Sequence, residues 1–277
     1  MTTRIRNQQG LSLVELMVSI VAGLVVIAGV TSVYLSTIVS SSDTLKQSKL
    51  NQEMTALMGV MSSDLRRAGI WGNMTANTDN FNNPQNNPFA QNNNTALDIF
   101  SGTTKVLAKN MVTNAATYSG GDCILYSYDN DEDGVVDTTD VLGFRRVEID
   151  GVGVVQMRTA SATDAAHNSC GDTDNSWTDV TDSDVVKITS LRFTLANSVC
   201  INVNEPDGTD SANDADTTAD NASELDCYTT TPASGNVTTE TRQVDISLAG
   251  ELISDSSVKS KMAQSVRVRN DLVIKQP

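Results

Sequence analysis

The stretch Leu11–Val30, LSLVELMVSIVAGLVVIAGV, decides the fold of this chain of 277 residues. It opens an apolar run that continues to Val39 without proline and with one charged side chain, that of Glu15. At a rise of about 1.5 Å per residue, a helix of this length can cross the hydrocarbon core of a membrane, which is about 30 Å thick. We therefore expect residues 11–39 to form a membrane-spanning helix.

The charges that flank this run predict its orientation. Arg4 and Arg6 precede the run, and Asp43 is the first charged residue after it. Because basic flanks stay in the cytoplasm, we expect a single pass with the N-terminus inside and the bulk of the chain exported. The run is too long for the apolar core of a cleaved secretory signal peptide, which is about 7–15 residues.

Glu15 is not explained by a plain membrane anchor. An unpaired carboxylate within an apolar segment costs a few kcal/mol on insertion scales. We therefore expect this side chain to have a partner of opposite charge.

The basic leader at residues 1–10 and the apolar run that begins with LSLVE resemble the class III signal of type IV prepilins and type II secretion pseudopilins. The resemblance implies that a prepilin peptidase cleaves after Gly10 and methylates the new amino terminus, Leu11, where the family more often has phenylalanine. Glu15 then becomes the fifth mature residue and pairs with the terminal amine of a neighbouring subunit. Removing either partner of such a buried pair costs about 3–5 kcal/mol, so the pair would enforce the register between subunits.

Helical periodicity continues beyond the membrane. Apolar residues recur at spacings of three and four, namely Leu50, Met54, Leu57, Met58, Met61, Leu65 and Ala68. Gly69 and Gly72 then end the pattern. These features predict one helix from about Leu11 to Ala68, about 85 Å long, whose amphipathic continuation at residues 40–70 needs a sheet to cover its apolar stripe.

Residues 71–277 are expected to form an exported, β-rich globular head. Asp150-Gly151 predicts a hairpin turn, so the sheet should be largely antiparallel. Polar, aperiodic segments predict loops at 75–95 and 202–226. The predicted strands are Ile124–Tyr128, Val141–Ile149, Val152–Met157, Val185–Leu195, Gln243–Leu248 and Val266–Ile274. With the long helix they predict an α+β fold of the pilin lollipop type.

Later stretches resemble PilW-type minor pilins, which are related to the J-type minor pseudopilins of type II secretion. They are SSDLRRAGIWGN, ILYSYDNDEDGVVD followed by LGFRR, VVKITSLRFTL and SVRVRNDLVI. The resemblance implies a structural subunit of the inner membrane, later extracellular in the pilus, that helps to prime type IV pilus assembly at or near the tip. It also implies four kinds of partner: other minor pilins, the major pilin, the prepilin peptidase and the inner-membrane assembly platform.

Two alternative functions remain open from the sequence. One is a J-type pseudopilin of a type II secretion system, and the other is an adhesin-like binding module displayed on the pilus. Glu15 bears on position, because the extreme tip subunit of the family tends to lack this glutamate. We therefore expect a place just below the tip.

Composition and motifs argue against two other classes of protein. With 19 basic and 34 acidic residues the net charge is −15, which disfavours a nucleic-acid partner, because phosphate binding needs clustered Lys and Arg. The single histidine, His167, lies in a polar stretch, and no nucleophile has an evident base partner. We therefore expect no enzymatic activity.

The four cysteines all follow the membrane segment and contain no C-x-x-C pair. An even number of cysteines in an exported region favours two disulfides over a metal site. Three pairings are possible. We favour Cys123 with Cys170 and Cys200 with Cys227, since the second pair would tether the polar segment between its members.

The stretch DNDEDGVVDTTD, residues 129–140, has the ligand spacing of a calcium-binding loop. Gly134 at position six permits the sharp turn that such a loop needs. Since the flanking segments are predicted strands, this would be a calcium-stapled hairpin with a structural role rather than an EF-hand sensor. The alternative is an acidic surface turn without an ion. The predicted ligands are Asp129, Asp131, Asp133, the backbone carbonyl of Val135, Asp137 through water, and Asp140.

Overall fold

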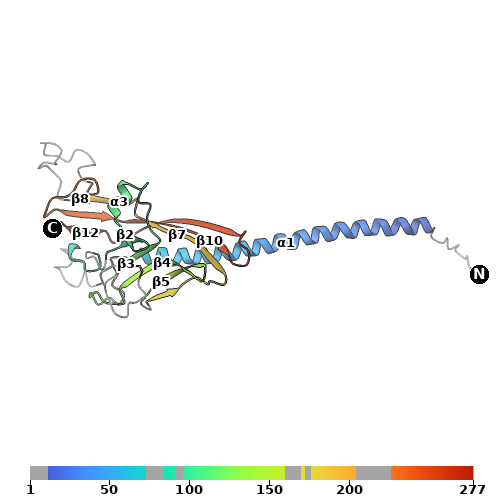
Figure 1. Cartoon of the computed structure of the whole chain (residues 1–277), viewed down its shortest axis with the longest axis horizontal. Helices are drawn as coiled ribbons and strands as arrows, with labels where there is room; N and C mark the ends of the chain where they lie inside the picture. The colour runs from blue at the N-terminus through green and yellow to red at the C-terminus, as the bar shows by residue number, and fades with distance from the viewer. Residues whose placement is uncertain are drawn as a thin grey trace, which may run out of the picture. The chain divides into compact units, whose positions relative to one another are not determined.

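The computed structural model describes residues 12–72, 84–90, 96–159, 170–171, 176–203 and 226–276. The chain forms two compact units, residues 1–49 and 50–277. Helix α1, Leu13–Leu65, supplies the described part of the first unit and the first element of the second. Figure 1 shows the elements of both units, each of which is described by itself.

In the first unit, α1 runs without interruption and its apolar side chains are largely exposed. Among the described residues, α1 is the one helix that is long and apolar enough to cross a membrane. The absence of proline up to Leu65 permits a helix of this length. The predicted long apolar helix is thus confirmed.

In the second unit, the end of α1 packs into the head. All seven residues of the predicted stripe, from Leu50 to Ala68, are buried. The helix ends at Leu65, three residues before the predicted end, because the next N–H groups form tighter turns: that of Arg67 donates to Asp64 and that of Ala68 to Leu65. Gly69 then adopts φ +76°, a conformation that glycine tolerates without strain.

The largest sheet has six antiparallel strands in the order β2-β1-β3-β4-β5-β6. The strands are β1 (Asp98–Ser101), β2 (Thr104–Val106), β3 (Cys123–Ser127), β4 (Val141–Ile149), β5 (Val152–Arg158) and β6 (Trp177–Asp179). As the sequence predicted, Asp150 and Gly151 connect β4 to β5, with φ of 51° and 83°. Two consecutive positive φ values are what the favoured type I′ hairpin turn requires.

Two further antiparallel sheets have three strands each, in the orders β11-β10-β7 and β12-β9-β8. Their strands are β7 (Val186–Thr194), β8 (Val199–Asn202), β9 (Val237–Thr241), β10 (Gln243–Leu252), β11 (Lys259–Arg267) and β12 (Leu272–Lys275). Two short helical segments complete the fold, η2 (Pro84–Asn86) and α3 (Ala108–Thr113).

The prediction of one strand over Val266–Ile274 is wrong. The chain leaves β11 after Arg267 and enters a different sheet at Leu272. Between them, the Val268 N–H donates to Arg242 O, and the Arg269 N–H donates to Arg66 O. These contacts with residues distant in sequence redirect the backbone, and apolar alternation could not reveal them.

The core lies between the end of α1 and the sheets. Along β10 buried and half-buried residues alternate strictly, as expected for a strand with one face on the helix. The helix stripe belongs to one cluster with Ile188, Leu191 and Phe193 of β7, Val244, Ile246 and Leu248 of β10, and Ile124, Tyr126, Phe144 and Val155 of the six-stranded sheet. In Figure 1, β7 and β10 run beside the end of α1. The predicted α+β class, with a helix packed on antiparallel sheets, is confirmed.

The predicted loop at 75–95 is not fully exposed. Phe89 is buried, its carbonyl accepts the Ser127 hydroxyl at 3.0 Å, and the Asn87 side-chain amide donates to Gly69 O at 2.8 Å. Residues 84–90 therefore pack against the turn after α1, while 73–83 and 91–95 lie outside the described residues. Most of the predicted loop at 202–226 also lies outside them.

We expect Met61→Ala to lower the free energy of unfolding by about 2–5 kcal/mol, because Met61 is fully buried and its loss leaves a cavity between α1 and the sheets. The measurement is urea unfolding of the full chain in detergent. Val60→Ala is the matched control, since Val60 is 45% exposed, and it should change the free energy by about 0.5 kcal/mol or less. Equal losses for the two variants would contradict the assignment of the buried stripe.

Candidate functional site

Glu15 lies in the first turn of α1. A carboxylate is favourable there because the helix dipole places partial positive charge at the N-terminus. The carboxylate is exposed, and it forms no hydrogen bond or ion pair with any residue that the structure describes. Gly10 and Leu11, the residues of the predicted cleavage and methylation site, lie outside the described residues, as does His167. The charge of Glu15 is therefore available to a group outside this chain's described part.

The apolar surface around Glu15 is continuous along the first unit. Exposed fractions run from 74% at Leu13 to 47% at Ile38, and a surface of this extent marks contact with lipid or protein. The hydroxyls of Thr31 and Thr37 donate to carbonyls four residues earlier, at 2.8 and 2.9 Å. Since these polar groups are satisfied within the helix, the segment suits an apolar environment apart from Glu15.

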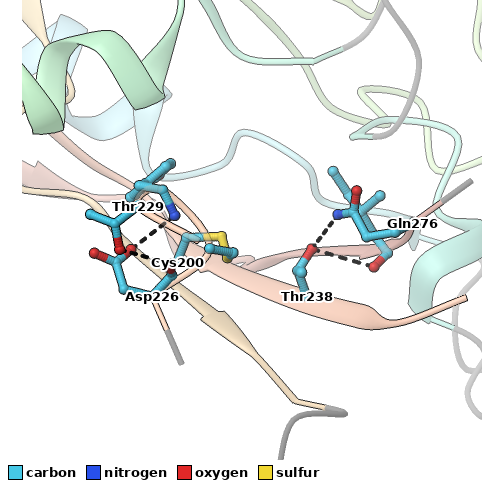
Figure 2. The surroundings of a disulfide bond; sticks show 8 residues. Cys200, Asp226, Thr229, Thr238 and Gln276 are labelled. Atoms are coloured by element: carbon cyan, nitrogen blue, oxygen red, sulfur yellow. Dashed lines mark hydrogen bonds between the residues drawn. A yellow bond between two sulfur atoms is a disulfide. The ribbon is translucent and has the colours of Figure 1, made fainter. Parts of the chain in front are cut away.

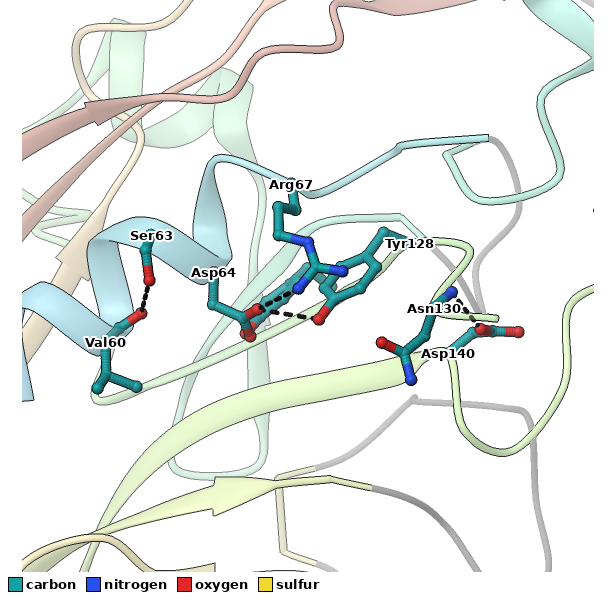
Figure 3. Close-up of polar contacts among 8 residues, drawn as sticks. Val60, Ser63, Asp64, Arg67, Tyr128, Asn130 and Asp140 are labelled. Carbon is teal, nitrogen blue, oxygen red and sulfur yellow. Dashed lines mark hydrogen bonds and ion pairs between the residues drawn. The ribbon is translucent and has the colours of Figure 1, made fainter. Parts of the chain in front are cut away.

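At the end of α1 a buried polar cluster joins the helix to β3. The carboxylate of Asp64 accepts the hydroxyl of Tyr126, and its other oxygen accepts the hydroxyl of Tyr128 at 2.9 Å. Arg67 reaches the same carboxylate at 3.8 Å, and its guanidinium lies over the Tyr128 ring at 4.1 Å from the ring centre. Figure 3 shows Asp64, Arg67 and Tyr128 converging from helix and strand. This cluster fixes where the helix ends on the sheet.

Burial and the neighbouring Asp64 carboxylate raise the pKa of both tyrosines above their ordinary value of 10.0. Both effects disfavour a negatively charged phenolate at these positions. The two hydroxyls therefore remain protonated donors throughout the physiological range.

The sequence analysis missed this cluster, although a signal was present. Asp64 falls three residues after Met61 and four before Ala68, so it lies on the buried face of the helix. An acidic residue on an apolar stripe needs a hydrogen-bonding partner. Tyr126 and Tyr128 are two residues apart, and alternate residues of an extended segment share one face.

The acidic loop between β3 and β4 brings three of the predicted ligands together. Carboxylate oxygens of Asp129, Asp131 and Asp133 lie within 4.8 Å of one another. The turn that gathers them needs positive φ at Glu132, 64°, and at Gly134, 81°. Asp129 is buried, whereas Asp131 and Asp133 are exposed.

The remaining predicted ligands have a different arrangement. The two oxygens of Asp140 accept the N–H groups of Asn130 and Asp137, each at 2.9 Å, and the first of these bonds is drawn in Figure 3. Asp137 accepts the N–H and hydroxyl of Thr139 at 2.7 and 2.8 Å. Neither carboxylate belongs to the group formed by the three other aspartates, and the Val135 side chain is exposed.

These hydrogen bonds also affect protonation. Burial raises the pKa of the Asp140 carboxyl, against the effect of the N–H groups of Asn130 and Asp137. Hydrogen bonds from Thr139 lower the pKa of the Asp137 carboxyl. Asp137 and Asp140 hold the shape of the loop around the three converging aspartates.

The structure pairs Cys123 with Cys170 and Cys200 with Cys227, the pairing that we favoured from the sequence. The first disulfide is buried beside Phe100 and Leu125. Among the described residues no cysteine is free.

The second disulfide joins β8 to the chain that resumes at Asp226, and Figure 2 shows its surroundings. Asp226 caps the following turn: its side chain accepts the Tyr228 N–H at 2.9 Å and its carbonyl accepts the Thr229 hydroxyl at 3.1 Å. The disulfide and this turn hold both ends of the acidic segment at 204–225, whose own residues lie outside the described ones. Elsewhere in Figure 2, Gln276 donates to the Thr238 hydroxyl at 2.9 Å, which secures the end of the chain against β9.

Two family models match the chain. The model described as prepilin peptidase-dependent protein B matches residues 43–268, and the model described as the prokaryotic N-terminal methylation motif matches residues 5–31. No curated protein and no solved structure matches the chain. The first match covers well over half of the sequence and includes the buried cluster, the acidic loop and both disulfides, while the second includes Glu15. This chain therefore belongs to the prepilin peptidase-dependent protein B family and is a type IV pilin-like protein.

Proposed function

We propose that the protein is a PilW-like minor pilin, a non-enzymatic structural subunit that helps to prime assembly of type IV pili and lies at or near the pilus tip. The observation that carries this proposal is the exposed apolar part of α1 with Glu15 in its first turn, within a segment that matches the methylation motif. Such a surface is stable only when lipid or other apolar helices cover it.

Before assembly, α1 lies in the inner membrane as a single pass, with the N-terminus in the cytoplasm and the head in the periplasm. The prepilin peptidase removes residues 1–10 and methylates Leu11. On the assembly platform the helix leaves the lipid and packs among the helices of other minor pilins and the major pilin. The Glu15 carboxylate then pairs with the terminal amine of a neighbour, which satisfies two charges that would otherwise be buried alone.

The retained glutamate supports a place just below the tip, where subunits lie on both sides of this one. Crosslinks from the exposed side chains of the head should therefore reach subunits above it as well as below it. A crosslinking map with no subunit above this chain would contradict that position.

Deletion of the protein tests the function. We expect pili to be lost from the cell surface and to return when the wild-type chain is supplied. The Glu15→Gln variant should restore few or none, because it cannot form the charge pair, whereas Glu53→Gln, on the exposed side of α1, should restore them fully. Normal pili with lost attachment would favour the adhesin, and intact pili with a secretion defect would favour the J-type pseudopilin.

A further inference from the structure

The loop between β3 and β4 contains a buried carboxylate oxygen that no described residue satisfies. Asp129 is 2% exposed. Its Oδ2 atom accepts the N–H groups of Gly72 at 2.9 Å and Gly134 at 3.0 Å, whereas its Oδ1 atom has no hydrogen-bond partner among the described residues. Buried polar atoms are nearly always paired, so an unpaired carboxylate oxygen indicates a missing ligand.

The surrounding charges show what kind of ligand would satisfy it. Oxygens of Asp131 and Asp133 lie with that of Asp129 within 4.8 Å of one another, and residues 129–140 contain no lysine or arginine. Carboxylates this close repel one another unless a cation lies between them. Calcium binds oxygens at about 2.3–2.6 Å, so two ligands of one ion lie at most about 5 Å apart, in agreement with the observed spacing.

The composition of the group favours calcium over magnesium. Calcium takes six to eight oxygens from several carboxylates, backbone carbonyls and water in flexible loops. Magnesium usually keeps several waters and binds through one or two carboxylates. Three converging aspartates on a turn through Glu132 and Gly134 match the first description.

We propose that Asp129, Asp131 and Asp133 bind one calcium ion, and that the ion locks the segment after α1 onto the β3–β4 loop. This inference is independent of the role proposed in the pilus. It differs from the ligand set expected from the sequence, because Asp137 and Asp140 orient the loop through backbone hydrogen bonds and lie outside the converging group.

The locking follows from what else Asp129 contacts. Its N–H donates to Ile70 O at 3.0 Å, and its Oδ2 holds the N–H of Gly72. The fit is close: a Cβ atom added at Gly72 would lie 3.0 Å from Glu132 Cα and 3.1 Å from Asp129 Oδ2. An ion bound at Oδ1 would therefore fix the residue that connects both segments.

The test is calcium binding by the full chain in detergent after removal of divalent ions with a chelator. Calorimetric titration should show one site, and calcium at 100 times Kd should raise the unfolding midpoint by about 5–10 °C. Magnesium at the same concentration should raise it far less. In hydrogen exchange, the amides of Gly72 and Gly134 should slow by up to about 100-fold, because opening must release the ion.

Two variants make the result specific. Asp131→Asn combined with Asp133→Asn should abolish the binding heat and the shift while the far-UV circular dichroism is unchanged, since both side chains are exposed. Glu132→Gln removes an exposed charge from the same loop without touching the group, and it should respond as the wild type does. No binding to the wild-type chain at 10 mM calcium would overturn the proposal, as would an equal response of the double variant or of magnesium.

Discussion

In cells that contain a prepilin peptidase, the Gly10→Val variant is expected to remain a precursor that starts at Met1, whereas the wild-type chain loses residues 1–10 and starts at methylated Leu11. The physical reason is local. Glycine has no Cβ, so the backbone at this bond can lie close to the protease, and a branched side chain holds it away. The match of residues 5–31 to the methylation motif places the processing site in this segment.

The measurement is intact mass together with N-terminal sequencing of the membrane-extracted protein. Asn7→Ala, in the same leader but away from the cut, should be processed as the wild type is. In a strain without the peptidase, every form should retain Met1. Processing of Gly10→Val to a Leu11 terminus would contradict the prediction, and a wild-type chain that keeps Met1 in both strains would overturn the pilin mechanism itself.

The same substitution should also exclude the protein from pili. Without cleavage there is no terminal amine at Leu11, so Glu15 of an adjacent subunit would be buried unpaired at a cost of about 3–5 kcal/mol. Immunodetection in sheared pili should therefore find the wild-type chain and not Gly10→Val. Because both proteins are compared in the membrane fraction as well, a lower amount of protein cannot be mistaken for failed assembly.

Asp64→Ala is expected to lower the free energy of unfolding of the full chain by about 3–5 kcal/mol. Each hydrogen bond to a charged group contributes about 1.5–3 kcal/mol, and the substitution leaves the hydroxyls of Tyr126 and Tyr128 without their acceptor. Urea unfolding in detergent measures the loss. Asp64→Asn should lose less, since its amide oxygen still accepts one hydroxyl.

Ser63→Ala is the matched control, because Ser63 is exposed and its hydroxyl bonds only the carbonyl of Val60 in the same helix. It should change the free energy by about 0.5 kcal/mol or less. In a double-mutant cycle, Asp64→Ala and Tyr128→Phe should couple by about 0.5–3 kcal/mol. Additive losses would mean that the Asp64–Tyr128 contact does not stabilise the head.

The raised tyrosine pKa values add a pH dependence to this test. The unfolded chain ionises tyrosine near 10.0, while Tyr126 and Tyr128 in the folded chain ionise at higher pH. The stability from these protonated hydroxyls is therefore complete below pH 10 and declines as the pH rises above it. The decline should be smaller in Asp64→Ala, because the carboxylate that raises both pKa values is gone.

The sequence by itself determined the features that depend on local order along the chain. Length and hydropathy specify the apolar helix, the spacing of three and four residues specifies the stripe that ends at Ala68, and Asp150-Gly151 specifies the β4–β5 turn. The leader and Glu15 identify the family, because a cleavage signal is read by a peptidase as an extended sequence and not as a fold. For the same reason the ligand spacing of the acidic loop was visible before its geometry was known.

Only the tertiary structure decided which distant groups meet. The short strands β1, β2, β6, β8 and β9 have three to five residues each, too few for a periodic signal, and they are stable because a neighbouring strand pairs with them. The break between β11 and β12 depends on Arg66 and Arg242, far away in sequence. The Asp64 cluster and the unpaired oxygen of Asp129 arise where the end of α1 meets β3, and a burial energy of this kind exists only once both partners have left water.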